Sequence, residues 1–414
     1  MPPMRAELLT IGSELLSGVT LNTNAPYLAR RLAECGIVCQ RQTAVSDERP
    51  LLLQALREAM GRADLLILTG GLGPTFDDIT TAAIAEATGH PLRFVPSVAA
   101  AIRRFYTRRH RRLQQAALRQ ASLPEGSRAL PNPIGTAPGI WLALPSHTII
   151  ALPGVPSEMR AITEAHVLPR LKRAGTGAAI ASRTLRTIGL VELSIESVLR
   201  RLRIPATIQV GLYPHLRMVD VRLTATAASQ RRARAALATI EQQLRQALGA
   251  SVYGTDEETL EGAVGRLLTA RRRTLGVAES CTGGLLSHQL TNIPGSSRYF
   301  RGGIIAYHNA IKQELLGVPP QLLARVGAVS APTAKAMAVG VRQAGRTDFG
   351  MALTGIAGPD GGTPAKPVGL VYLALADARG ARAKCCRFLG DRLSIKTQAT
   401  QAALDWLRRS LLRK

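Results

Sequence analysis

The chain alternates short apolar runs with amphipathic segments, first near its start and again over its last third. Near the start, the run DLLILTGG (64–71) ends in glycines, and DITTAAIAEATG (78–89) follows with helical apolar spacing. In the last third, GGIIAY (302–307) is followed by NAIKQELLG (309–317). A strand buried on both faces of a parallel sheet is continuously apolar. This alternation therefore predicts an α/β fold with two doubly wound α/β domains.

The length of the chain and the changes in residue pattern along it predict three domains. A chain of 414 residues is too long for one ordinary core. Between the two alternating parts, SRTLRTIGLVELSIESVLRRL and the segment after it indicate a small α+β module without a catalytic cluster. We expect domains at residues 1–170, 171–250 and 251–414, with the middle one acting as a linker domain.

Composition excludes several classes of protein. No run is long and apolar enough to span a bilayer, and the N-terminus lacks the basic–apolar–small order of a signal peptide. The five cysteines form no zinc-binding or disulfide pattern, because the pair Cys35 and Cys39 has no second pair of matching spacing. We expect reduced thiols, no membrane partner and a cytoplasmic location.

The formal charge of +25 suggests an anionic partner. Its densest patch is RRFYTRRHRR (103–112), in which two aromatic residues could stack on bases. Two other interpretations remain open. The patch could be a solvated helix face, and the positive electrostatic field of the chain could attract an anionic small-molecule substrate.

Three loops that follow predicted strands in the last third hold residues suited to acyl chemistry. The stretch VAESCTGGLLSHQL places Ser280 beside Cys281, ahead of a predicted helix. A serine nucleophile needs a base, and the candidates are His288, His308 and Lys312. His288 lies two helical turns, roughly 12 Å, beyond Ser280.

A partly desolvated Lys312 would have a lowered pKa and could accept the proton, with Tyr307 relaying it or orienting the pair. The amides of Gly283 and Gly284 would lie at a helix N-terminus and could stabilise an oxyanion. The third loop, TGIAGPDGGTPAKPVG (354–369), has the glycine density of a phosphate cradle. Each pattern alone is also typical of a structural turn.

Together, AESCTGG, GGIIAYHNAIKQELLGV and TGIAGPDGGTPAKPVGLVY resemble the C-terminal domain of the CinA family, whose activity is nicotinamide mononucleotide deamidation. The resemblance covers about residues 255–410. It implies that Ser280 attacks the carboxamide, that Tyr307 and Lys312 form the general-base pair, and that no cofactor is needed. The substrate-binding residues it implies are Gly283, Gly284, Thr354, Gly355, Gly358, Arg392 and Lys396.

Two positions depart from the family pattern. Lys396 stands where we expect arginine, and Asp360 stands where we expect glycine, so the Asp360 carboxylate should point away from a phosphate. Cys281 is expected to be a bystander beside the nucleophile.

Acidic residues also follow strands in the first third. Glu14 lies in GSELLSG, and Asp77 and Asp78 lie in TGGLGPTFDDIT (69–80). Carboxylates beside a glycine-rich loop suggest a nucleotide with a divalent metal, and the alternative is that one aspartate only caps the next helix. The loop residues expected to bind this substrate are Gly70, Gly71, Gly73 and Thr75.

Residues 5–170 resemble the molybdopterin-binding-like domain of the same family. The resemblance implies hydrolysis of ADP-ribose with a divalent metal (Mg, Mn or Co) and potassium. The middle segment resembles the family's KH-like linker, but it has no GXXG loop, so RNA binding is not expected there. We expect a homodimer that binds nicotinamide mononucleotide and ADP-ribose. The alternatives are a nucleic-acid-associated competence factor and a molybdopterin-binding module without hydrolase activity.

Overall fold

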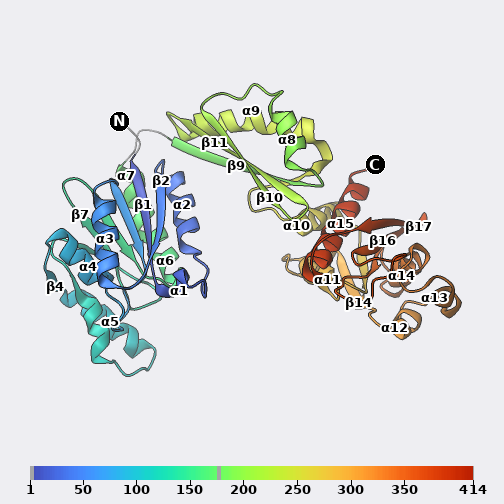
Figure 1. The fold of residues 1–414 in the computed structure, drawn as a ribbon, viewed down its shortest axis with the longest axis horizontal. Coiled ribbons are helices and arrows are strands. Elements are labelled where there is room, and N and C mark those ends of the chain that lie inside the picture. Colours follow the sequence, from blue (N-terminus) through green and yellow to red (C-terminus); the bar gives the residue numbers. More distant parts are fainter. Residues whose placement is uncertain (1–3, 175–178, 414) are drawn as a thin grey trace. The chain divides into compact units, whose positions relative to one another are not determined.

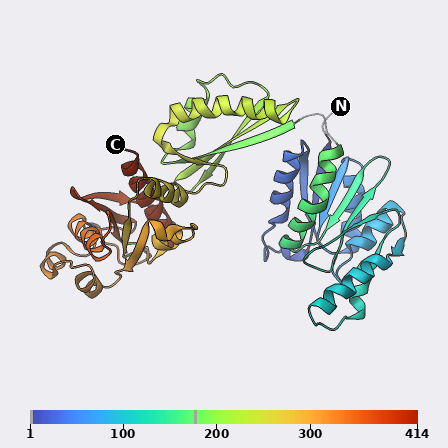
Figure 2. The ribbon, with the colours of Figure 1, turned by 180° about the vertical axis from the view of Figure 1, so that it is seen from behind.

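The computed structural model of the chain describes residues 4–174 and 179–413. It separates into two compact units, residues 1–182 with 224–237, and residues 183–223 with 238–414. The ribbon shows mixed α/β architecture (Figure 1, and from behind in Figure 2). The predicted fold class is therefore confirmed. Within the described residues, no helix has the length and apolar character needed to cross a membrane.

The N-terminal domain is built on a six-stranded sheet with the order β2-β1-β3-β8-β7-β6. The first four strands in this order are parallel, as predicted, whereas β7 runs antiparallel to both of its neighbours, β8 and β6. A separate antiparallel ribbon joins β4 (Leu92–Phe94) to β5 (Ser122–Pro124). The sheet strands are β1 (Arg5–Ile11), β2 (Val38–Val45), β3 (Leu65–Thr69), β6 (Arg128–Leu130), β7 (Gly139–Ala143) and β8 (Thr148–Leu152).

Helices cover both faces of this sheet. They are α1 (Ser13–Leu16), α2 (Asn24–Glu34), α3 (Arg49–Met60), α4 (Thr80–Thr88), α5 (Pro96–Arg108), α6 (Pro156–Ile162) and α7 (Leu168–Ala174), with a 3-10 turn at Gln115–Ala121 and a π turn at Thr163–Val167. On one face, Leu66 and Leu68 pack in a core with residues of α3, α4 and α5. On the other, Leu65 and Ile67 pack with residues of α2 and α6. Successive side chains of a strand point to opposite faces, which explains why β3 is apolar throughout.

The middle of the chain forms a four-stranded sheet with the order β10-β11-β9-β12. Its strands are β9 (Ala179–Ile188), β10 (Ile208–His215), β11 (Met218–Ala227) and β12 (Val252–Thr255), and its helices are α8 (Glu192–Leu199) and α9 (Gln230–Leu248). A 3-10 turn at Gly249–Ser251 links α9 to β12.

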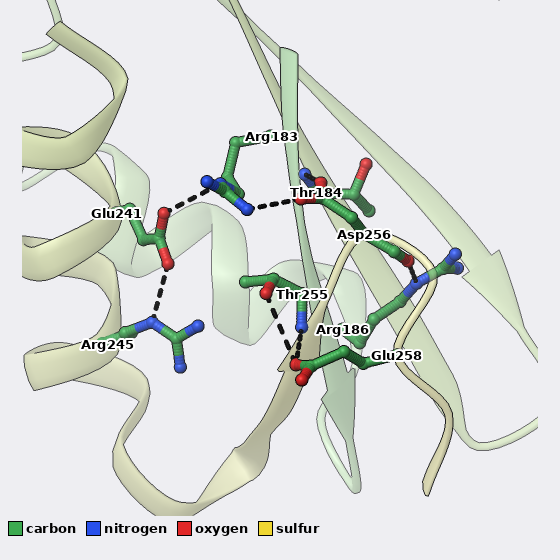
Figure 3. A network of polar contacts seen from close by, with 8 residues as sticks. All are labelled: Arg183, Thr184, Arg186, Glu241, Arg245, Thr255, Asp256 and Glu258. Carbon is green, nitrogen blue, oxygen red and sulfur yellow. Dashed lines mark hydrogen bonds and ion pairs between the residues drawn. The ribbon is translucent and has the colours of Figure 1, made fainter. Parts of the chain in front are cut away.

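A polar network fixes the exit of β12 to β9 within the second unit (Figure 3). Asp256 has a left-handed φ of 51°. Its carboxylate accepts hydrogen bonds from the Thr184 amide (3.0 Å) and from Arg183, and its carbonyl accepts one from Arg186 Nε at 2.6 Å. Arg183 also pairs with Glu241 at 3.0 Å. The loop that enters the C-terminal domain is therefore held by side chains of the strand beside it.

The C-terminal domain has a five-stranded sheet with the order β14-β13-β15-β16-β17. β14, β13 and β15 are parallel, and β16 runs antiparallel to both of its neighbours, β15 and β17. The strands are β13 (Leu275–Glu279), β14 (Phe300–Ile305), β15 (Phe349–Gly355), β16 (Leu370–Asp377) and β17 (Gly380–Arg387). The helices are α10 (Leu260–Ala270), α11 (Leu285–Thr291), α12 (Asn309–Glu314), α13 (Pro320–Val326), α14 (Ala331–Ala344) and α15 (Arg392–Leu412), with a 3-10 turn at Ser296–Arg298.

The three parallel strands determine where the candidate site lies. Val277 of β13 packs in one core with residues of α10 and α15, and the neighbouring Ala278 packs in another with residues of α14. The sheet is thus covered on both faces, and only its edges stay open to a ligand. Since parallel strands end at the same edge, the loops after β13, β14 and β15 emerge together.

Candidate active site

Ser280 begins a tight turn at the end of β13. Its amide donates to the Leu353 carbonyl of β15 at 2.9 Å, and its own carbonyl accepts from the Gly283 amide at 3.1 Å. Gly283 and Gly284 have φ values of 61° and 95°, a left-handed region that favours glycine. Ser280 is 8% exposed, so it lies at the rim of the core rather than on open surface.

Glu279, which sequence reasoning missed, organises this turn. Its side chain is fully buried. One carboxylate oxygen accepts from the amides of Gly284 (3.0 Å) and Leu286 (3.1 Å), and the other accepts from the amide (2.8 Å) and hydroxyl (2.7 Å) of Ser287. A negative charge is favourable at a helix N-terminus, where amides lack partners. The signal in the sequence was an ionisable residue that closes an otherwise apolar strand.

This carboxylate corrects the expected role of two amides. The Gly284 amide donates to Glu279 and the Gly283 amide donates to Ser280, so neither is free to stabilise an oxyanion. In the part of the chain that the structure describes, the amide of Thr282 has no acceptor. The buried Thr282 hydroxyl has no partner there either. These donors, rather than the glycines, are available to a ligand.

Lys312 of α12 is buried, with only 1% of its surface exposed. Its Nζ donates to the carbonyls of Ala306 (2.8 Å) and Tyr307 (3.0 Å), which follow β14. Burial lowers the pKa of the Lys312 ammonium below its ordinary value. A neutral amine has two N–H groups and one lone pair. The two carbonyls therefore satisfy its hydrogens and leave the lone pair able to accept a proton.

Arg392, at the start of α15, joins two of the loops. Its guanidinium donates to the Gly358 carbonyl at 2.6 Å and to the Tyr307 phenol oxygen at 2.9 Å. The Tyr307 side chain is 59% exposed and faces Arg392, whereas its contact with Lys312 runs through the backbone carbonyl. The main-chain carbonyl of Tyr307 therefore orients Lys312, and the phenol of Tyr307 lies beside the Arg392 guanidinium.

The other predicted substrate-binding residues differ in how they are used. The Lys396 ammonium is 3.6 Å from the place that a Cβ on Gly283 would occupy, so it lies over the Ser280 turn. Thr354 is fully buried, and its hydroxyl donates to the Ala328 carbonyl at 2.9 Å. A Cβ on Gly355 would come within 2.6 Å of the Leu370 carbonyl oxygen. Strand pairing with β16 therefore explains the glycine at this position without a ligand.

Gly358 also has a structural explanation in addition to its bond with Arg392. Its φ is 76°, and a Cβ there would lie 2.7 Å from Val368 Cγ1. Asp360, in the same loop, is exposed to solvent. The glycines of this loop are therefore needed for its path past Val368.

The two histidine candidates are engaged elsewhere. Exposed His288 hydrogen-bonds Asn292 at 3.2 Å, and His308 caps α12 by accepting the Ala310 amide at 3.3 Å. Cys281 packs in the core, and burial raises the pKa of its thiol to about 12. A buried thiol with a raised pKa is unreactive, as expected for a bystander.

In the N-terminal domain, the glycine-rich loop after β3 is closed by Asp78. Its carboxylate accepts from the amides of Gly73 (2.7 Å) and Thr75 (2.8 Å) and from the Thr75 hydroxyl (2.5 Å). Gly70 and Gly71 have left-handed φ values of 108° and 65°, so this turn needs glycine. The aspartate thus occupies the amides that were expected to bind a phosphate, which corrects the prediction for Gly73 and Thr75.

The predicted metal ligands do not gather. Asp78 is committed to the loop, Asp77 is exposed, and the Glu14 carboxylate folds over Gly12. Among residues 4–174 and 179–413, no group of three or more His, Cys, Asp or Glu side chains is arranged to hold a metal ion. The residues present therefore do not fit the divalent metal that was expected with Glu14, Asp77 and Asp78. The alternative, that one aspartate caps the next helix, is not seen either, since α4 has Ile79 at its N-cap and no side-chain cap, and Asp78 instead binds residues of the preceding loop.

Two α/β domains with glycine-rich turns at the carboxyl edges of their sheets, joined by a small α+β domain, define a modular α/β protein. Residues 7–173 match the family described as "Probable molybdopterin binding domain", residues 182–254 match "Damage-inducible protein CinA KH domain", and residues 257–411 match "CinA C-terminal domain". The chain belongs to the CinA family, as its motifs predicted.

Relatives match over the whole length. The chain is 44% identical to a "Putative competence-damage inducible protein" of Symbiobacterium thermophilum, over 99% of each chain. It is 47% identical to a "CinA-like protein" of Parasynechococcus marenigrum, over 98% of each. A solved structure of CinA from Thermoplasma acidophilum covers 41% of this chain and 98% of its own, with 35% identity and a TM-score of 0.38.

We expect Glu279→Gln to destabilise the C-terminal domain by about 2–3 kcal/mol, because the amide NH₂ would face N–H groups and leave at least one of them unsatisfied. Urea unfolding of the full chain measures this. Glu314→Gln is the matched control, since Glu314 is exposed at the end of α12 and should change stability by less than about 0.5 kcal/mol. Equal effects of the two variants would contradict the role of Glu279.

We expect Asp78→Asn to open the loop between Gly71 and Thr80, because asparagine cannot accept all three hydrogen bonds. Limited proteolysis should then cut this loop faster than in the unmodified chain. Asp77→Asn is the control, since Asp77 is exposed and should leave the rate unchanged. Faster cleavage in the Asp77 variant alone would show that the wrong aspartate was chosen.

Proposed function

We propose that the C-terminal domain is an amidohydrolase that converts nicotinamide mononucleotide and water into nicotinate mononucleotide and ammonia. The observation that carries the proposal is that Lys312 is buried and has a lowered pKa. Its Nζ donates to the carbonyls of Ala306 and Tyr307, directly after β14. A buried lysine whose pKa is lowered is suited to act as a general base. Ser280 lies after the neighbouring strand β13 and is the candidate nucleophile.

The proposed reaction has two steps, which are acylation of Ser280 with loss of ammonia and hydrolysis of the acyl-enzyme by water. Ser280 Oγ attacks the carboxamide carbon while Lys312 takes the hydroxyl proton. Lys312 then delivers that proton to the leaving nitrogen, and ammonia departs from an acyl-enzyme. A water, deprotonated by Lys312, attacks the ester and regenerates Ser280. In the described residues Ser280 Oγ and Lys312 Nζ share no hydrogen bond, and such contacts commonly tighten when substrate binds.

In this proposal, the donors that stabilise the oxyanion belong to the turn that Glu279 holds. The amide of Thr282, two residues after Ser280, has no acceptor among the described residues. Developing negative charge on the carboxamide oxygen would be stabilised by such a fixed donor without reorganisation. This gives Glu279 a positioning role, because its hydrogen bonds hold the far end of the same turn.

Two cations favour a phosphorylated substrate. Lys396 lies over the Ser280 turn, and Arg392 has N–H groups beyond those that bind Gly358 and Tyr307. Both could contact the phosphate of a mononucleotide, with lysine acting as a point charge where arginine would bind bidentately. The test is ammonia release from nicotinamide mononucleotide, with free nicotinamide as the control substrate. Equal rates on both would contradict phosphate recognition.

Hydrolysis of ADP-ribose by the N-terminal domain stays a prediction from the family resemblance. The closure of the glycine-rich loop on Asp78 and the dispersed carboxylates add no support to it. Release of AMP from ADP-ribose by the full chain, with Mg²⁺, Mn²⁺ or Co²⁺ and potassium supplied, is the direct assay.

We expect Ser280→Ala to reduce ammonia release by at least about a thousandfold, because it removes the attacking atom. Cys281→Ala should retain turnover and cost on the order of 1 kcal/mol of stability, because only a small buried thiol is lost. Thermal melts check that both variants are folded. A folded Ser280→Ala protein that still releases ammonia, together with an inactive Cys281→Ala protein, would reverse the assignment.

We expect ammonia release to rise with pH through the lowered pKa of Lys312, since only the neutral amine accepts a proton. Lys312→Arg should be almost inactive because a guanidinium does not deprotonate near neutrality. Turnover close to that of the unmodified chain would move the role of base to His308.

The same pKa can be measured without substrate. Between the lowered value and the ordinary 10.5, the unfolded state binds more protons, so the free energy of unfolding should rise with pH over that window. Lys312→Met should lack this rise.

A further inference from the structure

The strongest unexplained charge on the molecule lies in the N-terminal domain. Between Glu86 and Glu125 the sequence contains no acidic residue. This stretch includes α5, the 3-10 turn at 115–121 and the segment that connects them, which Figure 1 shows at the lower end of this domain. Six exposed arginines, which we call the arginine surface, lie at the end of α5 and just beyond it: Arg103, Arg104, Arg108, Arg109, Arg111 and Arg112.

The arginine surface has no carboxylate partner. Elsewhere in the same domain, some surface arginines are paired, as in Arg5 with Asp64 (3.0 Å) and Arg49 with Glu86. Even Arg93, in the same acid-free stretch, reaches Glu125 at 3.4 Å. In the part of the chain that the structure describes, none of the six forms an ion pair.

Helix stability does not account for this cluster. Cations are favourable in the last turn of a helix, where Arg108 lies in α5, with Arg109 as the C-cap. That effect ends within one turn, whereas Arg111 and Arg112 lie past the helix. Like charges packed together repel one another, so the cluster costs stability unless an anion neutralises it.

The aromatic residues of the patch have partners within the domain. Arg109 covers the Phe105 ring at 4.3 Å from its centre, and Tyr106 packs against the core. That these two rings could stack on bases stays a prediction, and the contacts within the domain do not support it. What remains exposed is guanidinium, which binds phosphate oxygens bidentately, and contacts to phosphate carry no sequence information.

We propose that the arginine surface binds the phosphate backbone of double-stranded DNA without sequence preference. A duplex carries one charge per roughly 1.7 Å of axis, which is the densest common array of phosphates. Arg104 and Arg108 are one helical turn apart, about 6 Å along α5. This binding is separate from the proposed amidohydrolase activity and involves none of its residues.

The test uses the full chain and a labelled duplex, with fluorescence anisotropy followed over a range of salt concentrations. The variant carries Arg104→Gln, Arg108→Gln and Arg112→Gln. The matched control carries Arg231→Gln, Arg232→Gln and Arg234→Gln, three exposed arginines of α9 without an ion pair among the described residues. Both variants lose three positive charges, and glutamine keeps a helix propensity close to that of arginine.

We expect the unmodified chain to bind duplexes of unrelated sequence equally, with log K falling linearly with log salt. The arginine-surface variant should lower the magnitude of that slope by about 3, close to one per phosphate contact. The control should change it by less than about 1. Equal loss in both variants would show that net charge alone attracts DNA and would overturn the proposal.

Three other outcomes would also overturn it. They are no binding by the unmodified chain at low salt, tighter binding to a single strand than to the duplex, and tighter binding to vesicles that contain phosphatidylserine. Since arginine stays charged across neutrality, the affinity for the duplex should be about the same at pH 6 and at pH 8. A strong pH dependence would instead point to His110.

Discussion

The C-terminal site depends on one interaction, the burial of the Glu279 carboxylate at the N-terminus of α11. A buried charge is costly unless hydrogen bonds replace its water. Here three amides and one hydroxyl do so, and no cation is needed. The turn that carries Ser280 is thereby fastened at one end to β13 and at the other to α11. Its geometry follows from packing inside the domain, before any substrate is bound.

Two cations at this edge are used in opposite ways. Lys312 is buried among carbonyls, which disfavours its charged form and suits it to proton transfer. Arg392 is exposed, stays charged and links the loops after β14 and β15. The difference in burial, rather than in residue type alone, separates a candidate base from a candidate anion-binding group. One edge of the sheet can therefore hold both functions.

The two outer domains show that similar loops need not have similar uses. Each has a turn with left-handed glycines after a central parallel strand. In the N-terminal domain, Asp78 folds back onto the amides of its own loop and closes it. In the C-terminal domain, the Glu279 carboxylate accepts from amides further along the turn, and the Thr282 amide stays without an acceptor in the described chain. The position of one carboxylate decides which amides a ligand can reach.

The sequence by itself determined the α/β class, the strands that line the candidate sites, the family, and the turn that holds Ser280. These features are local, since periodicity and glycine positions depend on neighbours along the chain. Only the tertiary structure decided that Glu279 holds the turn, that Asp78 occupies the glycine loop, that Arg392 joins distant loops, and that Arg109 covers Phe105. These contacts depend on where side chains meet after folding, and a hydrogen-bond partner leaves no periodic pattern in the sequence. The choice between a free amide and an occupied one therefore could not be made from residue spacing alone.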